Sequence, residues 1–270
     1  MKIIAFTKWI EKLPLKQIAE IVQKSGFDGV DLPVRSQSPI TEDLAPKVLP
    51  EAERIFADHG LTIETIVSGI SAPRPGLDEL LEAFRSVGVT KIRLAGISAR
   101  KGEDLRTKVD AVRRDLEGLE PVFRRHGIRG ALQIHSGPHL LSNVGICLHL
   151  LEGRDPACFG IQLDPGHLAL SGEMPHIAIN LAGQYLHTVN FKAPRLEPAF
   201  DPEQGKVTWR STWVPLWDGI VDWEEVLVLL KEAGYTGPIS IHAEYRSLYD
   251  RSDVNIEFSN EAMRKDCAYV

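Results

Sequence analysis

One junction recurs along the chain: a helical segment ends, a glycine follows, and an apolar residue opens a β-like run. The glycines of this junction are Gly26, Gly60, Gly88, Gly127 and Gly234. Glycine at this point suits the left-handed residue that closes a helix before a strand. The first four junctions are 28 to 39 residues apart, and the last gap of 107 residues holds three units of about 36. A chain of 270 residues therefore contains close to eight helix–strand units.

Strand-like and helical segments fall where this period places them. We expect strands at about residues 3–7, 28–33, 61–67, 91–96, 129–135, 159–164, 186–192 and 239–244. Helical patterns separate them, as at residues 15–24, 44–59, 104–126 and 223–233. Eight alternating units favour a closed (β/α)8 TIM barrel of the α/β class over an open doubly wound sheet. With no linker or composition shift to divide the chain, we expect one domain over residues 1–270.

Composition excludes several classes of function. The formal net charge of −6 argues against nucleic acid as a partner, because phosphate binding needs a basic face. No G-x-G-x-x-G or P-loop follows an expected strand, which disfavours nucleotide binding. Three widely spaced cysteines without a C-x-x-C pair suit a reducing compartment. No apolar run reaches membrane-spanning length or the length of a signal-peptide core, so we expect a cytoplasmic protein without a membrane partner.

Polar side chains gather in the last four barrel strands. Side chains alternate across a strand, and the face packed on helices must be apolar, so the polar parity points into the lumen. The residues concerned are Gln133, His135, Asp164, Asn190, Lys192, His242 and Glu244. They approach the C-terminal ends of the strands, where barrel active sites lie. Buried charged groups are rare unless they are paired or functional, so the set predicts an active site.

Further candidates lie in or near other strands. His167 follows Asp164-Pro165-Gly166, which is either an ordinary turn or a loop that brings His167 to the same ligand. Glu64 and Arg93 are polar within apolar strands and either bind substrate or pair with each other.

Residues 193–218 form an expected loop of about 26 residues without a clear helix, longer than an ordinary connection after a strand. It carries Trp209, Trp213 and Trp217. As a lid, the loop would stack these rings on a sugar; alternatively, they pin the loop to the barrel.

In its motifs the chain resembles the xylose isomerase-like TIM-barrel superfamily of sugar phosphate isomerases and epimerases, over essentially its full length. The segments that carry the resemblance are 26–31, 133–137, 163–167, 190–192, 215–219, 221–223 and 237–245. The resemblance implies a divalent metal held by Glu, Asp, His and Glu from strands 5 to 8, with the two glutamates moving protons beside a carbonyl. Asp164 and Glu244 match this pattern, whereas Gln133 stands in place of the first glutamate and Asn190 in place of the histidine.

These two departures leave two arrangements open. In the first, Asp164, Glu244, Gln133 and Asn190 hold Mn²⁺, Mg²⁺ or Zn²⁺, more weakly than a full carboxylate set, and Glu244, His135 or His167 acts as acid or base. In the second, Lys192 and the histidines replace the metal and stabilise an enediolate. Either way, the substrate-binding candidates are His242, Trp209, Trp213, Trp217, Arg93 and Glu64.

The expected function is a sugar isomerase or epimerase that transfers a proton next to a carbonyl. A keto-sugar or inosose dehydratase or lyase is the second hypothesis, and a catalytically impaired sugar-binding barrel is the third, motivated by Gln133 and Asn190. A DNA-repair nuclease is disfavoured, because such relatives use a richer His/Glu cluster for zinc. The expected partner is a small carbohydrate, and the oligomeric state is left open, with a homo-oligomer as one option.

Overall fold

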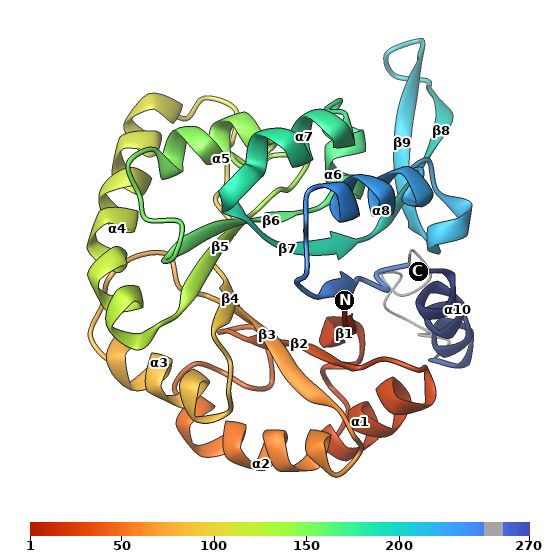
Figure 1. Cartoon of the computed structure of the whole chain (residues 1–270). Helices are drawn as coiled ribbons and strands as arrows, with labels where there is room; N and C mark the ends of the chain where they lie inside the picture. Colours follow the sequence, from red (N-terminus) through yellow and green to blue (C-terminus); the bar gives the residue numbers. More distant parts are fainter. Residues whose placement is uncertain (246–255) are drawn as a thin grey trace.

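The structure, a computed structural model, describes residues 1–245 and 256–270 of the chain (Figure 1). Eight parallel strands close into a barrel in the order β1-β10-β7-β6-β5-β4-β3-β2. Their bounds are β1 Ile3–Phe6, β2 Gly29–Val34, β3 Thr62–Ser68, β4 Lys91–Arg93, β5 Arg129–Gln133, β6 Phe159–Leu163, β7 Leu186–Phe191 and β10 Ile239–Ile241. The expected (β/α)8 barrel is confirmed, and each barrel strand lies where the period places it. Strands β4 and β10 end earlier than expected, at Arg93 and Ile241.

The helices form a ring outside the barrel (Figure 1). They are α1 Leu15–Lys24, α2 Ala45–Ala57, α3 Leu77–Ser86, α4 Leu105–His126, α5 Val144–Leu151, α6 Pro165–Ser171, α7 Pro175–Ala182, α8 Trp223–Glu232 and α10 Ile256–Tyr269, with short 3-10 turns η1 Thr7–Ile10, η2 Gly183–Tyr185 and η3 Leu216–Asp218. The four helices expected at residues 15–24, 44–59, 104–126 and 223–233 are confirmed to within two residues at each end.

The junction glycines adopt the backbone that the repeat predicts. Gly127 closes α4 with φ +59°, and the other four junction glycines also have positive φ. This left-handed conformation costs a residue with a Cβ about 1–2 kcal/mol, which is why glycine recurs there. Between these junctions, helices lay apolar stripes on the barrel, such as Leu116, Leu119 and Phe123 of α4, all buried.

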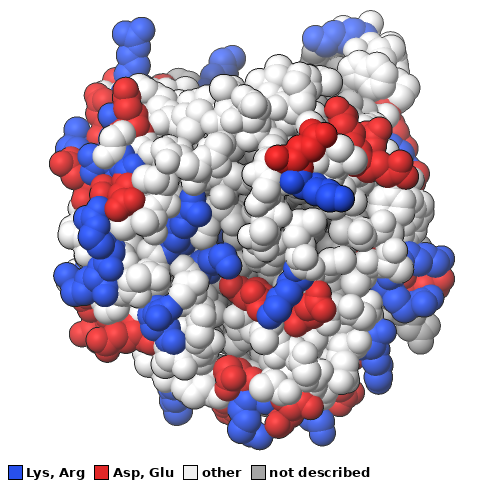
Figure 2. All heavy atoms as spheres, viewed as in Figure 1, with Lys and Arg blue, Asp and Glu red and all other residues white. Residues whose placement is uncertain are grey.

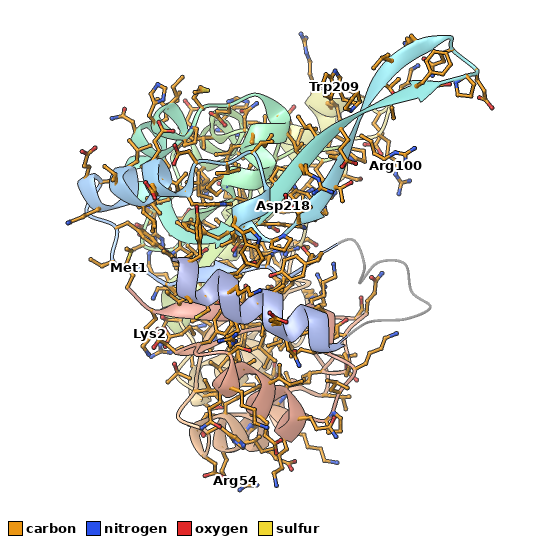
Figure 3. The ribbon with its side chains drawn as sticks, turned by 90° about the vertical axis from the view of Figure 1, so that its right-hand side faces the viewer. Met1, Lys2, Arg54, Arg100, Trp209 and Asp218 are labelled. Carbon is orange, nitrogen blue, oxygen red and sulfur yellow. The ribbon has the colours of Figure 1, made fainter. Side chains whose placement is uncertain are left out.

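The segment after β7 differs from the expected loop. Residues 193–214 form an antiparallel hairpin of β8 Ala193–Asp201 and β9 Lys206–Val214, followed by η3. The hairpin projects beyond the barrel (Figures 1 and 3), and Phe200 and Trp209 on it are 67% and 69% exposed. The absence of a helix from residues 193–214 agrees with the expectation, but the loop expectation missed the two strands, because residues 206–214 are rich in the β-branched and aromatic side chains that favour strands.

On the face that Figure 2 shows, acidic and basic side chains are interspersed over the outer helices. Within residues 1–245 and 256–270, no helix combines the length and the apolar composition needed to cross a membrane.

Candidate active site

A cavity of about 440 Å³ opens at the C-terminal ends of the barrel strands. Its walls come from both halves of the barrel, from α6 and from the hairpin. They are formed by residues at or just after the ends of β1, β2, β4, β5, β7 and β10, by His167 and Leu170 of α6, and by Ser211 and Trp213 of β9. Polar groups from distant parts of the sequence therefore share one cavity, as the strand parity predicts.

Another hollow, of about 500 Å³, lies at the opposite end of the barrel around Lys91, Arg129 and His187. Its main polar groups are already engaged there: Arg129 donates to the carbonyls of Phe159 and Gln184, and the His187 ring contacts the carbonyl of Arg129. We therefore place the candidate active site in the cavity at the C-terminal ends.

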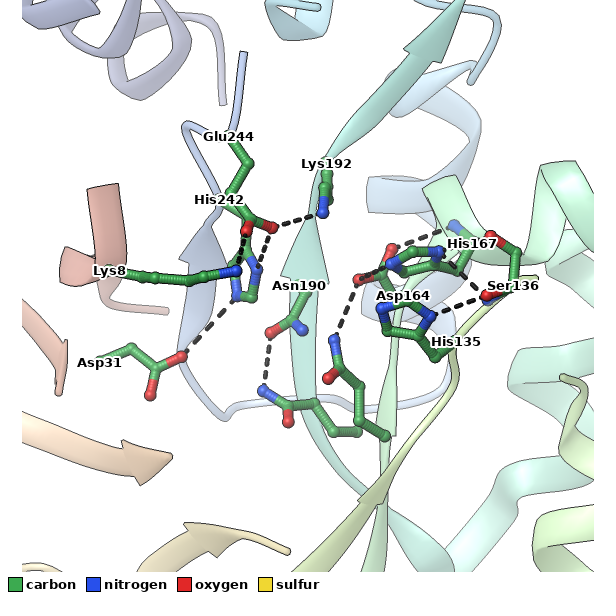
Figure 4. Close-up of polar contacts among 12 residues, drawn as sticks. Lys8, Asp31, His135, Ser136, Asp164, His167, Asn190, Lys192, His242 and Glu244 are labelled. Atoms are coloured by element: carbon green, nitrogen blue, oxygen red, sulfur yellow. Dashed lines mark hydrogen bonds and ion pairs between the residues drawn. The ribbon is translucent and has the colours of Figure 1, made fainter. Parts of the chain in front are cut away.

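One side of the cavity carries the Glu244 cluster, which consists of Lys8, Asp31, Lys192, His242 and Glu244 (Figure 4). Lys8 Nζ donates to Glu244 Oε1 at 2.8 Å, and Lys192 Nζ donates to Oε2. His242 Nδ1 lies 3.8 Å from the same Oε2. Burial opposes ionisation of Glu244, but Lys192, His242 and Lys8 together hold its pKa well below the usual range. The cavity therefore contains an ionised carboxylate held between two ammonium groups.

Asp31 lies on the other side of His242 from Glu244. Thr65 Oγ1 donates to Asp31 at 2.6 Å and Ser240 Oγ donates at 3.0 Å. His242 Nε2 is 3.8 Å from the same carboxylate, and the ring of Phe6 stacks on the imidazole with centroids 4.2 Å apart. His242 is thus held between two carboxylates and a phenyl ring, which leaves its ring little freedom to turn.

The opposite side of the cavity carries the His167 cluster of His135, Ser136, Asp164 and His167 (Figure 4). The backbone N–H of Ser136 donates to His167 Nδ1 at 3.2 Å, and Ser136 Oγ lies 2.8 Å from the same nitrogen. Because Nδ1 accepts, the proton of the neutral ring is assigned to Nε2, which lies 3.9 Å from Asp164 Oδ2. Burial lowers the pKa of His167 far below its ordinary value, so the ring is neutral.

His135 is a second neutral imidazole in the same cluster. Its Nδ1 lies 2.8 Å from the carbonyl oxygen of Ser136, which can only accept, so Nδ1 carries the proton and Nε2 is an acceptor. Burial, with the nearby charges of Lys192 and Arg93, lowers the pKa of His135 to about 4. The ring stacks on His167 with centroids 4.0 Å apart and lines the cavity.

Asp164 caps α6 below the cavity floor. Its Oδ1 accepts from the backbone N–H of His167 at 3.1 Å, and its Oδ2 accepts from Gln133 Nε2 at 3.4 Å. The side chain has no exposed surface, and burial raises its pKa. Asp164 therefore orients His167 and does not itself line the cavity, whereas His167 does.

The four residues carried over as metal ligands do not form a cation-binding set. Gln133 presents its N–H₂ group to Asp164, and Asn190 Oδ1 accepts from Gln162 Nε2 at 2.7 Å. Both oxygens of Glu244 already face ammonium groups. Within the described ranges, no group of three or more His, Cys, Asp or Glu residues could hold a metal ion. The amide donors and the lysines do not fit the oxygen-rich first arrangement.

Of the three tryptophans expected to bind substrate, one lines the cavity and two do not. Trp213 lines the cavity, with its ring centroid 4.1 Å from Lys192 Nζ and its edge against His167. Trp209 and Trp217 are 69% and 45% exposed and do not line the cavity, so stacking on a bound sugar stays a prediction for Trp213 alone.

Glu64 and Arg93 are also separated. Glu64 pairs with Lys2 at 2.5 Å at the N-terminal ends of the strands, away from the cavity. Arg93 lines the cavity. The expected alternative, in which Glu64 and Arg93 pair with each other, was wrong because they lie at different heights in the barrel.

Six of the residues that line the cavity were not expected from the sequence: Lys8, Arg35, Ser136, Phe6, Leu170 and Ser211. Lys8 comes two residues after β1, and Arg35 directly follows β2. Ser136 belongs to the segment 133–137 that carries the family resemblance. Lys8 and Arg35 could have been found only from their positions, because residues that directly follow barrel strands lie at the active-site rim.

Comparison with known proteins agrees with the barrel fold. Residues 19–268 match the family model described as xylose isomerase-like TIM barrel. An inosose dehydratase of Lacticaseibacillus casei is 26% identical over 134 residues, which are 48% of this chain and 45% of that protein, so the match spans less than half of the relative's length.

Solved structures show the same fold at low sequence identity. The 3-keto-D-glucoside 4-epimerase YcjR from E. coli has a TM-score of 0.74 and 16% identity, over 100% of this chain and 98% of that one. The IOLI protein with a binding zinc atom also has a TM-score of 0.74, with 15% identity over 100% and 97% of the two chains. From its family match over most of its length, the chain belongs to the xylose isomerase-like TIM barrel family.

Proposed function

We propose that the protein is an isomerase or epimerase of a small sugar that moves a proton on the carbon next to a carbonyl group. The main support for the proposal is that two groups able to exchange protons face each other across one cavity. The ionised carboxylate of Glu244 lies on one side and the neutral imidazole of His135 on the other, with Lys192 between the two clusters (Figure 4). Exchange of a proton at a carbon needs a base and an acid that reach the same substrate.

Lys192 supplies the charge that the reaction requires. Removing a proton beside a carbonyl places negative charge on the carbonyl oxygen, and a nearby ammonium stabilises that charge most strongly where water is excluded. Lys192 is 6% exposed and Trp213 covers it. When the substrate oxygen draws the ammonium of Lys192, one oxygen of Glu244 loses a stabilising partner, so its basicity rises as the carbon acid arrives.

The His167 cluster provides the second proton path. His135 Nε2 is an acceptor in the resting site, and Ser136 Oγ contacts His167 Nδ1 at 2.8 Å. A substrate hydroxyl bound here exchanges its proton with an imidazole while Glu244 acts at the carbon. In an isomerisation Glu244 moves the proton between two carbons while an imidazole moves the hydroxyl proton to the carbonyl oxygen. In an epimerisation one side takes a proton from the carbon and the other side delivers a proton to its opposite face.

Deuterium exchange tests the proposal directly. The purified protein is incubated in D2O with a panel of ketoses and aldoses, including phosphorylated and acidic sugars, and substrate carbons are followed by NMR. We expect solvent deuterium at the carbon next to the carbonyl, and loss of this signal in Glu244→Gln and in His135→Asn. Glu64→Gln, at the other end of the barrel, is the matched control and should exchange like the wild type. Absence of exchange across the panel would count against the proposal.

A dehydratase of a keto-sugar or inosose is the second candidate. The inosose dehydratase relative favours it, and the same two clusters suit it, since proton abstraction beside a carbonyl precedes loss of a hydroxyl from the neighbouring carbon. Mass spectrometry distinguishes the two reactions. An isomer or epimer has the mass of its substrate, whereas a dehydratase product has lost one water.

A further inference from the structure

Two arginines line the part of the cavity away from Lys192. Arg35 directly follows β2, and Arg93 is the last residue of β4, with β3 between these strands in the barrel. Both side chains line the cavity that contains Glu244 and His135. They enter it from the first half of the barrel, whereas Lys192 and Glu244 follow β7 and β10.

Neither guanidinium has an ion-pair partner within the part of the chain that the structure describes. Arg93 Nε is buried without a hydrogen-bond acceptor. Arg35 Nε makes a long hydrogen bond of 3.4 Å to the hydroxyl of Ser38. Burial, together with repulsion from Arg35, lowers the pKa of Arg93 to about 10, so Arg93 is still charged at neutral pH. Two like charges in one partly enclosed space are unfavourable unless a counter-charge joins them.

The carboxylates nearest to Arg93 are already engaged. Asp31 accepts hydrogen bonds from Thr65 and Ser240, Glu244 faces two lysines, and Asp164 accepts from Gln133 and the backbone of His167. Among the described residues that line the cavity, Lys8, Arg35, Arg93 and Lys192 are cationic, while Glu244 is the one carboxylate. The cavity lining therefore has an excess of positive charge, which a neutral sugar does not balance.

We propose that the substrate carries an oxyanion group, either a carboxylate or a phosphate, that binds between Arg35 and Arg93. Guanidinium groups suit this role because their planar N–H donors match the oxygens of both anions. Anchored there, the group directs the reacting carbon toward Lys192 and Glu244 on the other side of the cavity. The inference rests on the proposed function for the rest of the substrate, a small sugar or polyol.

Binding of three matched polyols tests the subsite without requiring turnover. Isothermal titration calorimetry at fixed, low ionic strength compares neutral D-glucitol, D-gluconate and D-glucitol 6-phosphate. We expect the preferred anion to bind at least about tenfold more tightly than D-glucitol, since bonds between charged groups are the stronger ones. Preference for gluconate assigns a carboxylate substrate, and preference for the phosphate ester assigns a sugar phosphate.

Charge-removing variants locate the subsite. Arg35→Gln and Arg93→Gln should each lower the affinity for the anion about tenfold or more and leave that for D-glucitol unchanged. Arg93→Lys, which keeps the charge, should retain part of the affinity if Arg93→Gln folds poorly. Arg85→Gln on the exposed face of α3 is the control and should bind like the wild type.

Two results would overturn the inference: D-glucitol binding as tightly as both anions, or anion affinity unchanged in Arg35→Gln and Arg93→Gln. Absence of anion binding altogether would also overturn it. If the anion binds as expected but no deuterium exchange occurs with any sugar, the proposed function fails while the subsite stands.

Discussion

Lys192 and Glu244 form an ion pair at the end of the barrel, and the ammonium of Lys192 also lies 4.1 Å from the ring centroid of Trp213. In the family pattern that the sequence resembles, a metal ion occupies this part of the site and Glu244 is one of its ligands. Here Gln133 and Asn190 replace two ligands of that pattern, and a lysine faces the remaining glutamate. We infer that Lys192 supplies at this point the positive charge that a metal ion would otherwise supply.

Removal of Lys192 therefore should impair chemistry more than binding. In Lys192→Met, a side chain of similar length keeps the contact with Trp213 but has no charge for the developing oxyanion. We expect kcat to fall about 10²- to 10³-fold, the range for loss of one group that stabilises an oxyanion, with KM changing much less. Steady-state kinetics on a sugar found by deuterium exchange measures both constants. Lys2→Met, at the far end of the barrel, is the control, and equal loss in both variants would contradict the role of Lys192.

Chelation should leave the activity unchanged. Because both oxygens of Glu244 face ammonium groups and Gln133 presents N–H to Asp164, the described site offers no set of anionic ligands for a divalent cation. We expect dialysis against EDTA to change kcat/KM less than twofold, about the precision of the measurement, and elemental analysis to find less than one divalent ion per chain. Loss of activity on dialysis that Mn²⁺ or Mg²⁺ restores would contradict this arrangement.

The pH dependence of the reaction should have an unusually low acid limb. Neutral His135 is the competent form, and burial lowers its pKa from 6.5 to about 4. A lowered pKa keeps the imidazole neutral at any pH above about 4, so activity is retained through pH 5 and is lost only as the pH falls below that value. A profile of kcat/KM from pH 3.5 to 8 measures this limb. A limb near pH 6.5 would show that His135 titrates like an exposed histidine and has no such environment.

The sequence predicts the barrel and the inward-facing residues, but it does not predict which of these residues line the cavity. The spacing of the junction glycines gives the eight units, and alternation along each strand gives the inward face, so Gln133, Asn190 and Lys192 were placed correctly on that face. Alternation does not give the height of a residue along the barrel axis. Glu64 belongs to the same barrel interior but lies near the start of β3 with Lys2, far from the cavity.

Other features depend on contacts that no local pattern encodes. Lys8 follows β1 and reaches Glu244 only because the barrel closes β1 on β10, and Arg35 follows β2 and reaches the same cavity from another wall. The direction in which Gln133 presents its amide depends on Asp164, a residue of another strand end. The sequence therefore predicts which groups are present, whereas their partners decide whether they bind a metal, an anion or each other.

Asp266 should make the stability of the fold depend on pH. This residue of α10 is 1% exposed, accepts from the backbone N–H of Leu216 at 2.8 Å and contacts the hydroxyl of Tyr245. Burial raises its pKa from 3.8 to about 7. The unfolded chain ionises Asp266 near pH 4, whereas the folded chain ionises it only near pH 7, so the stabilisation is complete below pH 4 and is lost as the pH rises through 7.

Asp266→Asn removes this titration while its amide oxygen still accepts a hydrogen bond. At about 1.4 kcal/mol for each pH unit between the two pKa values, the wild type should lose about 2–3 kcal/mol between pH 5 and pH 8 that the variant does not lose. Urea unfolding at both pH values, followed by circular dichroism, measures the difference. Asp110→Asn on the exposed side of α4 is the control and should keep the wild-type dependence. A variant that loses as much stability as the wild type over this range would show that Asp266 is ionised in the folded chain throughout it, and that α10 is held without a protonated carboxyl group.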